Sequence, residues 1–217
     1  MVNESTKKGQ FVELDFTARI KQTNALFDTS IKEEAKKANM PLDKVKPLIF
    51  CIGEGMVLKG LDKALEEKEL GKDYSIELGP KEAFGNRDAK LIKILPIQVF
   101  TSKGINPYPG LILNMDDMLA RISAVSGGRV ITDFNNPLAG KDILYNFKVK
   151  RILNDNKEKL ECLVSYFLKE DPKKAIKSVE GNKALIETRI KWPDKFLKEI
   201  TERIEKLTTL KIDVKSV

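Results

Sequence analysis

The fold of this chain is organised around Phe50-Cys-Ile-Gly-Glu-Gly-Met-Val-Leu-Lys-Gly-Leu-Asp-Lys-Ala-Leu65. A short apolar strand, residues 48–52, runs into Gly53 and Gly55, where the backbone can turn at positive φ without a Cβ penalty. The apolar residues that follow open a helix, and the first backbone N–H groups of a helix have no intrahelical partner. Apolar side chains beside such donors predict the floor of a pocket, although a well-packed helix start without a function would show the same pattern.

Composition restricts the class of protein. The chain has 217 residues, of which 33% are charged and 41% hydrophobic, as is typical of a soluble globular protein with a substantial core. No apolar run approaches the roughly 20 residues that a membrane span requires. Residues 1–9 contain no apolar segment of the kind that a secretory signal needs. We therefore expect a cytoplasmic protein that does not associate with membranes.

The residue types also restrict the chemistry. Histidine is absent, which excludes Ser-His-Asp and Cys-His catalysis and the usual general base near neutral pH. Cys51 and Cys162 lie far apart in apolar patterns, so we expect buried free thiols rather than a disulfide or a metal site. The formal charge is +7, but the lysines are dispersed, which favours a solvated basic surface over a nucleic-acid site. We expect neither a metal nor a cofactor.

Hydrophobic periodicity predicts a first sheet. From Phe11 to Ile20 every even position is apolar and most odd positions are polar, the pattern of a half-buried strand. Further short strands are predicted at 25–29 and 74–78. Thr29 or Ser30 is predicted to cap the helix that follows the strand at 25–29.

The stretch from Arg87 to Asp133 differs from its surroundings. Four short β-like runs, at 92–99, 111–115, 121–125 and 130–134, are separated by Gly and Pro turns, which predicts a small all-β unit. A strand around 145–149 then completes the first sheet. This order favours an insertion inside a host domain over a domain joined end to end.

Residues beyond Leu153 predict a separate α+β domain. Amphipathic helices are predicted at 160–168 and 196–207, a hairpin turns at Gly181-Asn182, and a strand closes at 210–214. The order is therefore αββαβ.

Six motifs occur in the order seen in FKBP-type peptidyl-prolyl cis-trans isomerases, which this chain therefore resembles. They are Val12-Glu-Leu-Asp-Phe16, Leu26-Phe-Asp28, Ile52-Gly-Glu-Gly-Met-Val-Leu-Lys-Gly-Leu61, Ala83-Phe-Gly85, Leu138-Ala-Gly140 and Phe147-Lys-Val149. The insertion resembles the insert-in-flap domain of SlyD-like members, and the C-terminal addition resembles the long archaeal form. The resemblance implies a bent antiparallel sheet around one helix, formed by 1–86 and 135–153, with a chaperone insertion at 87–134 and an α+β domain at 154–217.

The resemblance also implies a prolyl site. Its catalytic residues would be Asp28, Leu58, Phe84 and Phe147, and its substrate-binding residues would be Phe16, Phe27, Phe50, Met56, Val57, Leu61 and Leu138. In the family the aspartate projects into an apolar cavity, whereas from its residue type alone Asp28 would be a turn cap. The N–H of Leu58 would bind a substrate carbonyl.

The sequence departs from the family pattern in several places. Phe16 and Phe84 stand where tyrosine is common, and Leu61 replaces the tryptophan of macrolide-binding members. A His/Cys-rich tail is lacking, so the nickel binding associated with SlyD does not carry over. Macrolide affinity is left open.

The insertion carries more apolar residues than so small a unit can bury well. Those predicted to form a chaperone surface are Ile97, Val99, Phe100, Tyr108, Leu111, Leu113, Met115 and Met118. Exposed apolar area with methionines suits the capture of unfolded chains, while the alternative is that these residues form the unit's own core.

The expected function is isomerisation of X-Pro bonds in unfolded, proline-containing polypeptides, combined with folding-chaperone activity. A non-catalytic holdase or peptide-binding module is the alternative. A homodimer formed through the C-terminal domain is a third hypothesis.

Overall fold

The computed structural model describes residues 4–216. Part of the stretch 1–9, which was considered for a secretory signal, therefore lies outside the described residues. The described chain forms two compact units. The first contains residues up to Arg19, Ala25–Glu77 and the residues from Leu144 onward. The second contains Ile20–Asn24 and Leu78–Ile143. The chain is a mixed α+β protein, as predicted.

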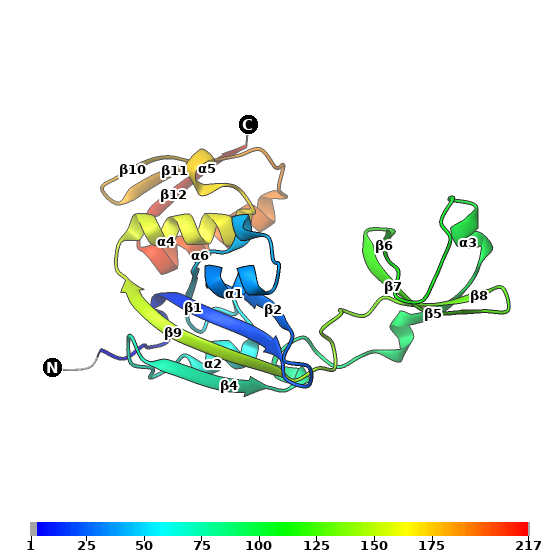
Figure 1. Ribbon diagram of the computed structural model, residues 1–217. Helices are drawn as coiled ribbons and strands as arrows, with labels where there is room; N and C mark the ends of the chain where they lie inside the picture. Colours follow the sequence, from blue (N-terminus) through cyan, green and yellow to red (C-terminus); the bar gives the residue numbers. More distant parts are fainter. Residues whose placement is uncertain (1–3, 217) are drawn as a thin grey trace. The chain divides into compact units, whose positions relative to one another are not determined.

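The first unit contains a five-stranded antiparallel sheet with the order β2-β1-β9-β4, in which β3 also pairs with β1. In Figure 1, β1 and β9 run side by side through its middle. The alternation predicted for the first strand is confirmed, because Val12 and Leu14 are fully buried and Phe16 is 5% exposed. The strands are β1 (Phe11–Ile20), β2 (Leu26–Thr29), β3 (Leu48–Cys51), β4 (Asp73–Leu78) and β9 (Ile143–Leu153).

Three short helical segments lie between these strands, namely α1 (Lys32–Lys37), the 3-10 turn η1 (Leu42–Lys44) and α2 (Lys59–Ala64). The predicted cap of α1 is wrong, since its N-cap is Ile31 and no side chain caps it. Thr29 and Ser30 instead bind the main chain of Phe16: the Thr29 hydroxyl donates to the Phe16 carbonyl, and the Ser30 hydroxyl accepts from its N–H, both at 2.8 Å. These side chains join β1 to the end of β2.

The second unit contains a four-stranded sheet with the order β5-β8-β7-β6. Its core consists of Phe100, Ile122 and Val130. The predicted strand 92–99 ends early at Pro96, which has no N–H for the ladder, and a short helix follows. This region is therefore not all-β. Its elements are η2 (Pro80–Glu82), η3 (Ala89–Leu91), β5 (Ile92–Pro96), α3 (Gln98–Thr101), β6 (Ile112–Met115), β7 (Met118–Ser126) and β8 (Arg129–Asp133).

The C-terminal segment, residues 154–216, adds helices and a three-stranded sheet with the order β10-β11-β12 to the first unit. The predicted hairpin is present, and β12 pairs with β11 in parallel. The elements are α4 (Asn156–Leu163), a π-helical turn η4 (Val164–Leu168), α5 (Pro172–Ala175), β10 (Ile176–Glu180), β11 (Lys183–Thr188), α6 (Asp194–Thr208) and β12 (Lys211–Ser216).

The C-terminal segment and the first sheet share one hydrophobic core. Phe11 and Cys51, from β1 and β3, lie in the same buried cluster as Leu160 of α4 and Ile204 of α6. Figure 1 shows α4 and α6 between the three-stranded sheet and the first sheet. The predicted boundary at Leu153 therefore crosses a continuous core.

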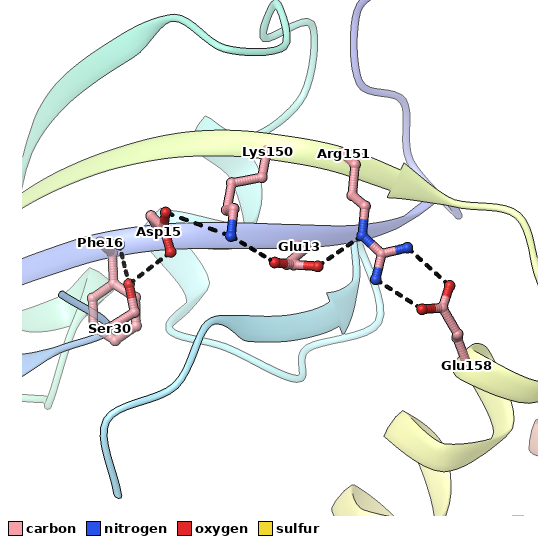
Figure 2. A network of polar contacts seen from close by, with 7 residues as sticks. All are labelled: Glu13, Asp15, Phe16, Ser30, Lys150, Arg151 and Glu158. Carbon is pink, nitrogen blue, oxygen red and sulfur yellow. Dashed lines mark hydrogen bonds and ion pairs between the residues drawn. The ribbon is translucent and has the colours of Figure 1, made fainter. Parts of the chain in front are cut away.

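A polar network at the surface of the first unit reinforces this packing (Figure 2). Arg151 of β9 forms a bidentate ion pair with Glu158 of α4 (2.8 and 2.9 Å) and also contacts Glu13 of β1 (2.7 Å). Lys150 continues the row to Glu13 (2.9 Å) and Asp15 (3.8 Å). The network ties the two central strands to the first turn of α4.

Candidate functional site

The turn that precedes α2 has the backbone geometry predicted from its glycines. Gly53 and Gly55 have φ values of +82° and +66°. Asp62, on α2 and only 8% exposed, accepts hydrogen bonds from both of their N–H groups, at 2.7 and 3.1 Å. One buried carboxylate therefore holds the turn in place from its inner side.

Leu58 lies where this turn meets the helix. It is the N-cap of α2, with φ −54° and ψ 136°, and its carbonyl accepts the first helical hydrogen bond from Asp62. Within residues 4–216, the N–H of Leu58 donates to no protein acceptor. This donor is available to a carbonyl from outside the chain.

An aromatic pair connects the two central strands. Phe16 of β1 and Tyr145 of β9 stack with ring centroids 5.3 Å apart and ring planes at 21°. Both side chains are 5% exposed. The main chain at Phe16 is also held by Thr29 and Ser30, as described above, so the ring has a well-defined position.

Asp28 is the acidic group near this pair. It is the last residue but one of β2 and is exposed as a whole, yet partial burial of its carboxyl raises its pKa, against the opposing effect of the Thr29 backbone N–H. Burial also raises the pKa of Tyr145, and the charge of Asp28 raises it further. The carboxylate and the phenol hydroxyl therefore lie close enough for their charges to interact.

The other predicted site residues lie in several environments. Phe50 and Leu61 are each 1% exposed, and Phe27 and Val57 are half-buried. Phe147 is buried and stacks on Tyr74 at 5.4 Å. Met56 packs against the core shared with the C-terminal helices, and its sulfur accepts from the Cys51 N–H at 3.4 Å. Phe84 and Leu138 belong to the second unit, where both are half-buried.

Sequence reasoning missed two residues of this site. Tyr145 lies two positions before Phe147 on the same face of β9, so strand periodicity was a usable signal for both, and the family motif favoured Phe147 alone. Asp62 follows the glycine turn within the stretch 50–65. Its burial is not apparent from the sequence, because it arises when helix α2 packs back onto the turn.

An apolar groove of about 330 Å³ lies in the second unit. It is lined by Leu91, Lys93, Leu95, Val99, Met115, Asp116, Met118 and Phe134. Of the predicted chaperone surface, Val99, Met115 and Met118 line this groove, whereas Phe100 is 1% exposed and lies in the core. Tyr108 is exposed, and Ile97, Leu111 and Leu113 pack partly against the core. Ile94, Ile112 and Leu119 are exposed apolar residues that the prediction did not include.

Residues 4–216 contain neither a metal-ligand cluster nor a membrane-spanning helix. No group of three or more Cys, Asp or Glu side chains in this range is arranged to hold a metal ion. None of the helices there combines the length and the apolar composition needed to cross a bilayer. Both cysteines are free thiols, as predicted, but only Cys51 is buried, whereas Cys162 is half-buried.

Comparison with known proteins connects this geometry to a family. Residues 2–100 match the model of the FKBP-type peptidyl-prolyl cis-trans isomerases, and residues 93–138 match that of the FKBP26 IF domain. A short-type peptidyl-prolyl cis-trans isomerase from Methanocaldococcus jannaschii is 30% identical over 67% of this chain and 93% of its own length. The chain belongs to the FKBP-type peptidyl-prolyl cis-trans isomerases. The predicted family and enzyme class are thereby confirmed.

Two bacterial FKBP-type isomerases named SlyD are also similar. The protein from Helicobacter pylori is 28% identical over 67% of this chain and 73% of its own length. That from Escherichia coli is 30% identical over 52% of this chain and 60% of its own length. SlyD-like membership of the FKBP family, suggested by the insertion between β4 and β9, is thus supported by relatives as well as by the IF-domain match.

Proposed function

We propose that this FKBP-type chain isomerises X-Pro bonds by desolvating them in an apolar pocket of the first unit, without proton transfer or a covalent intermediate. The pocket would be formed by Phe16, Tyr145, Phe50 and Leu61, with Asp28 at its edge and the Leu58 N–H as the donor to substrate. Tyr145 joins the predicted set on the evidence of its stacking on Phe16.

The chemistry needs only a suitable environment. Amide resonance imposes a rotation barrier of roughly 18–20 kcal/mol and places partial negative charge on the carbonyl oxygen. Water stabilises that planar, polar form, while the twisted form has a smaller dipole. A pocket without water therefore favours the twisted amide relative to the planar one, and only such differential binding accelerates the reaction. A chain without histidine can catalyse this step.

The stacked pair of Phe16 and Tyr145 beside a carboxylate of raised pKa is the observation that carries this proposal. The raised pKa of Asp28 reflects partial burial of its carboxyl, and the buried rings of Phe16 and Tyr145 supply the surface from which water is excluded. The unoccupied N–H of Leu58 adds a directional contact for a carbonyl next to the substrate proline.

A protease-coupled cis/trans assay on a proline-containing tetrapeptide tests the proposal. The wild-type protein should accelerate isomerisation, and Asp28→Ala and Tyr145→Ala should each lower kcat/KM by about tenfold or more, equivalent to about 1.4 kcal/mol of transition-state stabilisation. Phe147→Ala distinguishes the contribution of Phe147 from that of Tyr145, the other of these two aromatic residues of β9, because Phe147 stacks on Tyr74 rather than on Phe16. No acceleration by the wild-type protein would favour the alternative, a non-catalytic holdase.

We also propose a chaperone function for the second unit, in which its groove binds apolar segments of unfolded chains. Val99, Met115 and Met118 line the groove, and exposed Ile94, Ile112 and Leu119 add apolar surface on the opposite face of the same sheet. Methionine side chains adapt to ligands of different shape, and apolar patches on a small unit mark binding surfaces.

Two assays with different substrates test the chaperone function. Met115→Lys combined with Met118→Lys should slow proline-limited refolding of an unfolded protein while sparing turnover of a tetrapeptide. Deletion of Arg87–Asp133 should have the same effect to a greater extent. Equal losses on both substrates would contradict a separate role for this unit.

A further inference from the structure

The turn before α2 is bound on its outer side by the C-terminal segment. Arg203 of α6 donates to the Glu54 carboxylate from Nε (3.1 Å) and Nη2 (2.8 Å), and Nη2 also donates to the Glu54 carbonyl (2.7 Å). Tyr166 of η4 donates its hydroxyl to the Gly55 carbonyl at 3.2 Å. Two consecutive peptide carbonyls of the turn are therefore hydrogen-bonded to residues more than a hundred positions away in sequence.

The donors on this outer side are themselves held in position. The guanidinium carbon of Arg203 lies 4.9 Å from the centre of the Phe167 ring, and Phe167 packs edge-on against Tyr166 at 5.0 Å. Both aromatic residues belong to the π-helical turn η4, a type of distortion often found at functional sites. A stacked guanidinium is pre-organised, so less conformational entropy is lost when its hydrogen bonds form.

Charge attraction alone does not explain the importance of this contact. Arg203 is 42% exposed, and an exposed ion pair contributes little to stability. Hydrogen bonds to main-chain carbonyls have a different effect, because they restrict the peptide planes themselves. Asp62 binds the N–H groups of Gly53 and Gly55 on the inner side. The backbone donors of the turn are therefore bound on its inner side, and its backbone carbonyls are bound on its outer side.

The turn leads directly to the proposed substrate contacts. Gly55 is separated from Val57 by Met56 and from Leu58 by Met56 and Val57, and the Met56 side chain packs against the core shared with the C-terminal helices. A rotation of the Gly55 peptide would therefore be transmitted to the Leu58 N–H. Displacements of about 1 Å in a positioning group can cost about 100-fold in rate.

We propose that Arg203 and Tyr166 are positioning residues of the isomerase, which hold the turn so that the Leu58 N–H and the Val57 side chain keep their orientation toward the substrate. The C-terminal segment would thereby set the catalytic rate of the first sheet's site. This inference rests on the isomerase function proposed above.

The chain contains a matched control for this role. Glu158 of α4 also joins the C-terminal segment to the first sheet, through its bidentate ion pair with Arg151 of β9. Neither residue is hydrogen-bonded to the turn in these contacts. Glu158→Gln should therefore weaken docking of the C-terminal segment without affecting residues 53–58.

The test compares Arg203→Gln, Tyr166→Phe, their double variant and Glu158→Gln in the full chain. We expect the double variant to lower kcat on a tetrapeptide by about tenfold with KM nearly unchanged, and Arg203→Lys to recover part of the loss through one donor to Glu54. Amide hydrogen exchange at Gly55 and Leu58 should accelerate in the double variant, with a melting temperature equal to that of Glu158→Gln. Glu158→Gln should keep wild-type kcat.

The outcomes that overturn the inference differ from those that overturn the function. A double variant with kcat within about twofold of wild type, or an equal loss of kcat in Glu158→Gln, would show that the contact is only structural. An inactive wild-type protein would refute the proposed isomerase function and this inference with it.

Discussion

Asp28 combines a proposed role in the site with an energetic cost to the folded state. Burial disfavours its charged form and raises its pKa, so ionisation destabilises the folded protein relative to the unfolded chain. This penalty is fully present above the folded-state pKa and disappears as the pH falls below the ordinary carboxyl value. Asp28→Asn should therefore raise the melting temperature at pH 7, with a gain that vanishes toward pH 3.

The same substitution should change the pH dependence of catalysis. We expect wild-type kcat/KM to vary as Asp28 titrates and then to stay constant through neutral pH, since the chain has no histidine. Asp28→Asn should give a flat profile at the value of the protonated wild-type protein. A titration step that persists in Asp28→Asn would assign the dependence to a different group.

Tyr145 is expected to act through its ring rather than its hydroxyl. Tyr145→Phe preserves the stacking on Phe16 and should keep both the stability and most of the activity. Tyr145→Ala opens a cavity in a side chain that is 5% exposed and should lower the free energy of unfolding by about 3–5 kcal/mol. Urea denaturation measures the free energy of unfolding, and the tetrapeptide assay, performed below the unfolding transition, measures the activity.

Cys51 and Cys162 should be unreactive in the folded protein. Burial raises the pKa of each thiol to about 12, and the Cys162 thiol donates to the Ile49 carbonyl at 3.2 Å. Because the thiolate is the nucleophile, alkylation at pH 8 should be slow until a denaturant is added. Rapid labelling of the native protein at either residue would contradict this burial.

At the scale of an element, the turn before α2 depends on one carboxylate. Asp62→Ala leaves the N–H groups of Gly53 and Gly55 without their acceptor and should destabilise the protein by about 1–3 kcal/mol. It should also accelerate amide exchange in the turn. Lys63→Ala is the matched control, because Lys63 is the exposed next residue of the same helix. Equal effects of both substitutions would mean that helix α2 as a whole, rather than the carboxylate, determines the stability of the turn.

Elements with a strong local signal were predictable from the sequence. The alternation in β1 and the glycines at positive φ are local properties, and the structure confirms both. The cap of α1 was wrong because Thr29 and Ser30 are used by a neighbouring strand, an interaction that depends on tertiary structure. The strand predicted to reach Val99 was also wrong, since Pro96 ends the ladder.

The candidate site was predictable in part for the same reason. Motif order proposed Phe16, Asp28 and the helix start, and it named Phe147 but not Tyr145, although both lie on one face of β9. Their difference arises from the partner strands, since Tyr145 stacks on β1 and Phe147 on β4. The hydrogen bond from Arg203 to the turn joins two segments that are far apart in sequence, and neither segment contains a local pattern that predicts the other.

At the scale of the whole chain, the shared core predicts that the first sheet depends on the C-terminal segment. A chain that ends at Leu153 would expose Phe11 and Cys51, which are 1% and 0% exposed in the complete chain. It should melt at a lower temperature and bind a hydrophobic dye, as measured by thermal unfolding and fluorescence. Retention of the full melting temperature would contradict the shared core. Sedimentation of the complete chain tests the separate hypothesis of a homodimer.

The position of α6 has a consequence for biosynthesis. A ribosome releases β1 long before it completes α6, yet Ile204 of α6 belongs to the same buried cluster as Phe11 of β1 and Cys51 of β3. Part of the apolar face of the first sheet must therefore remain uncovered until the C-terminal helices have been synthesised. Folding of the first unit would thus be completed only after residues 154–208 have left the ribosome.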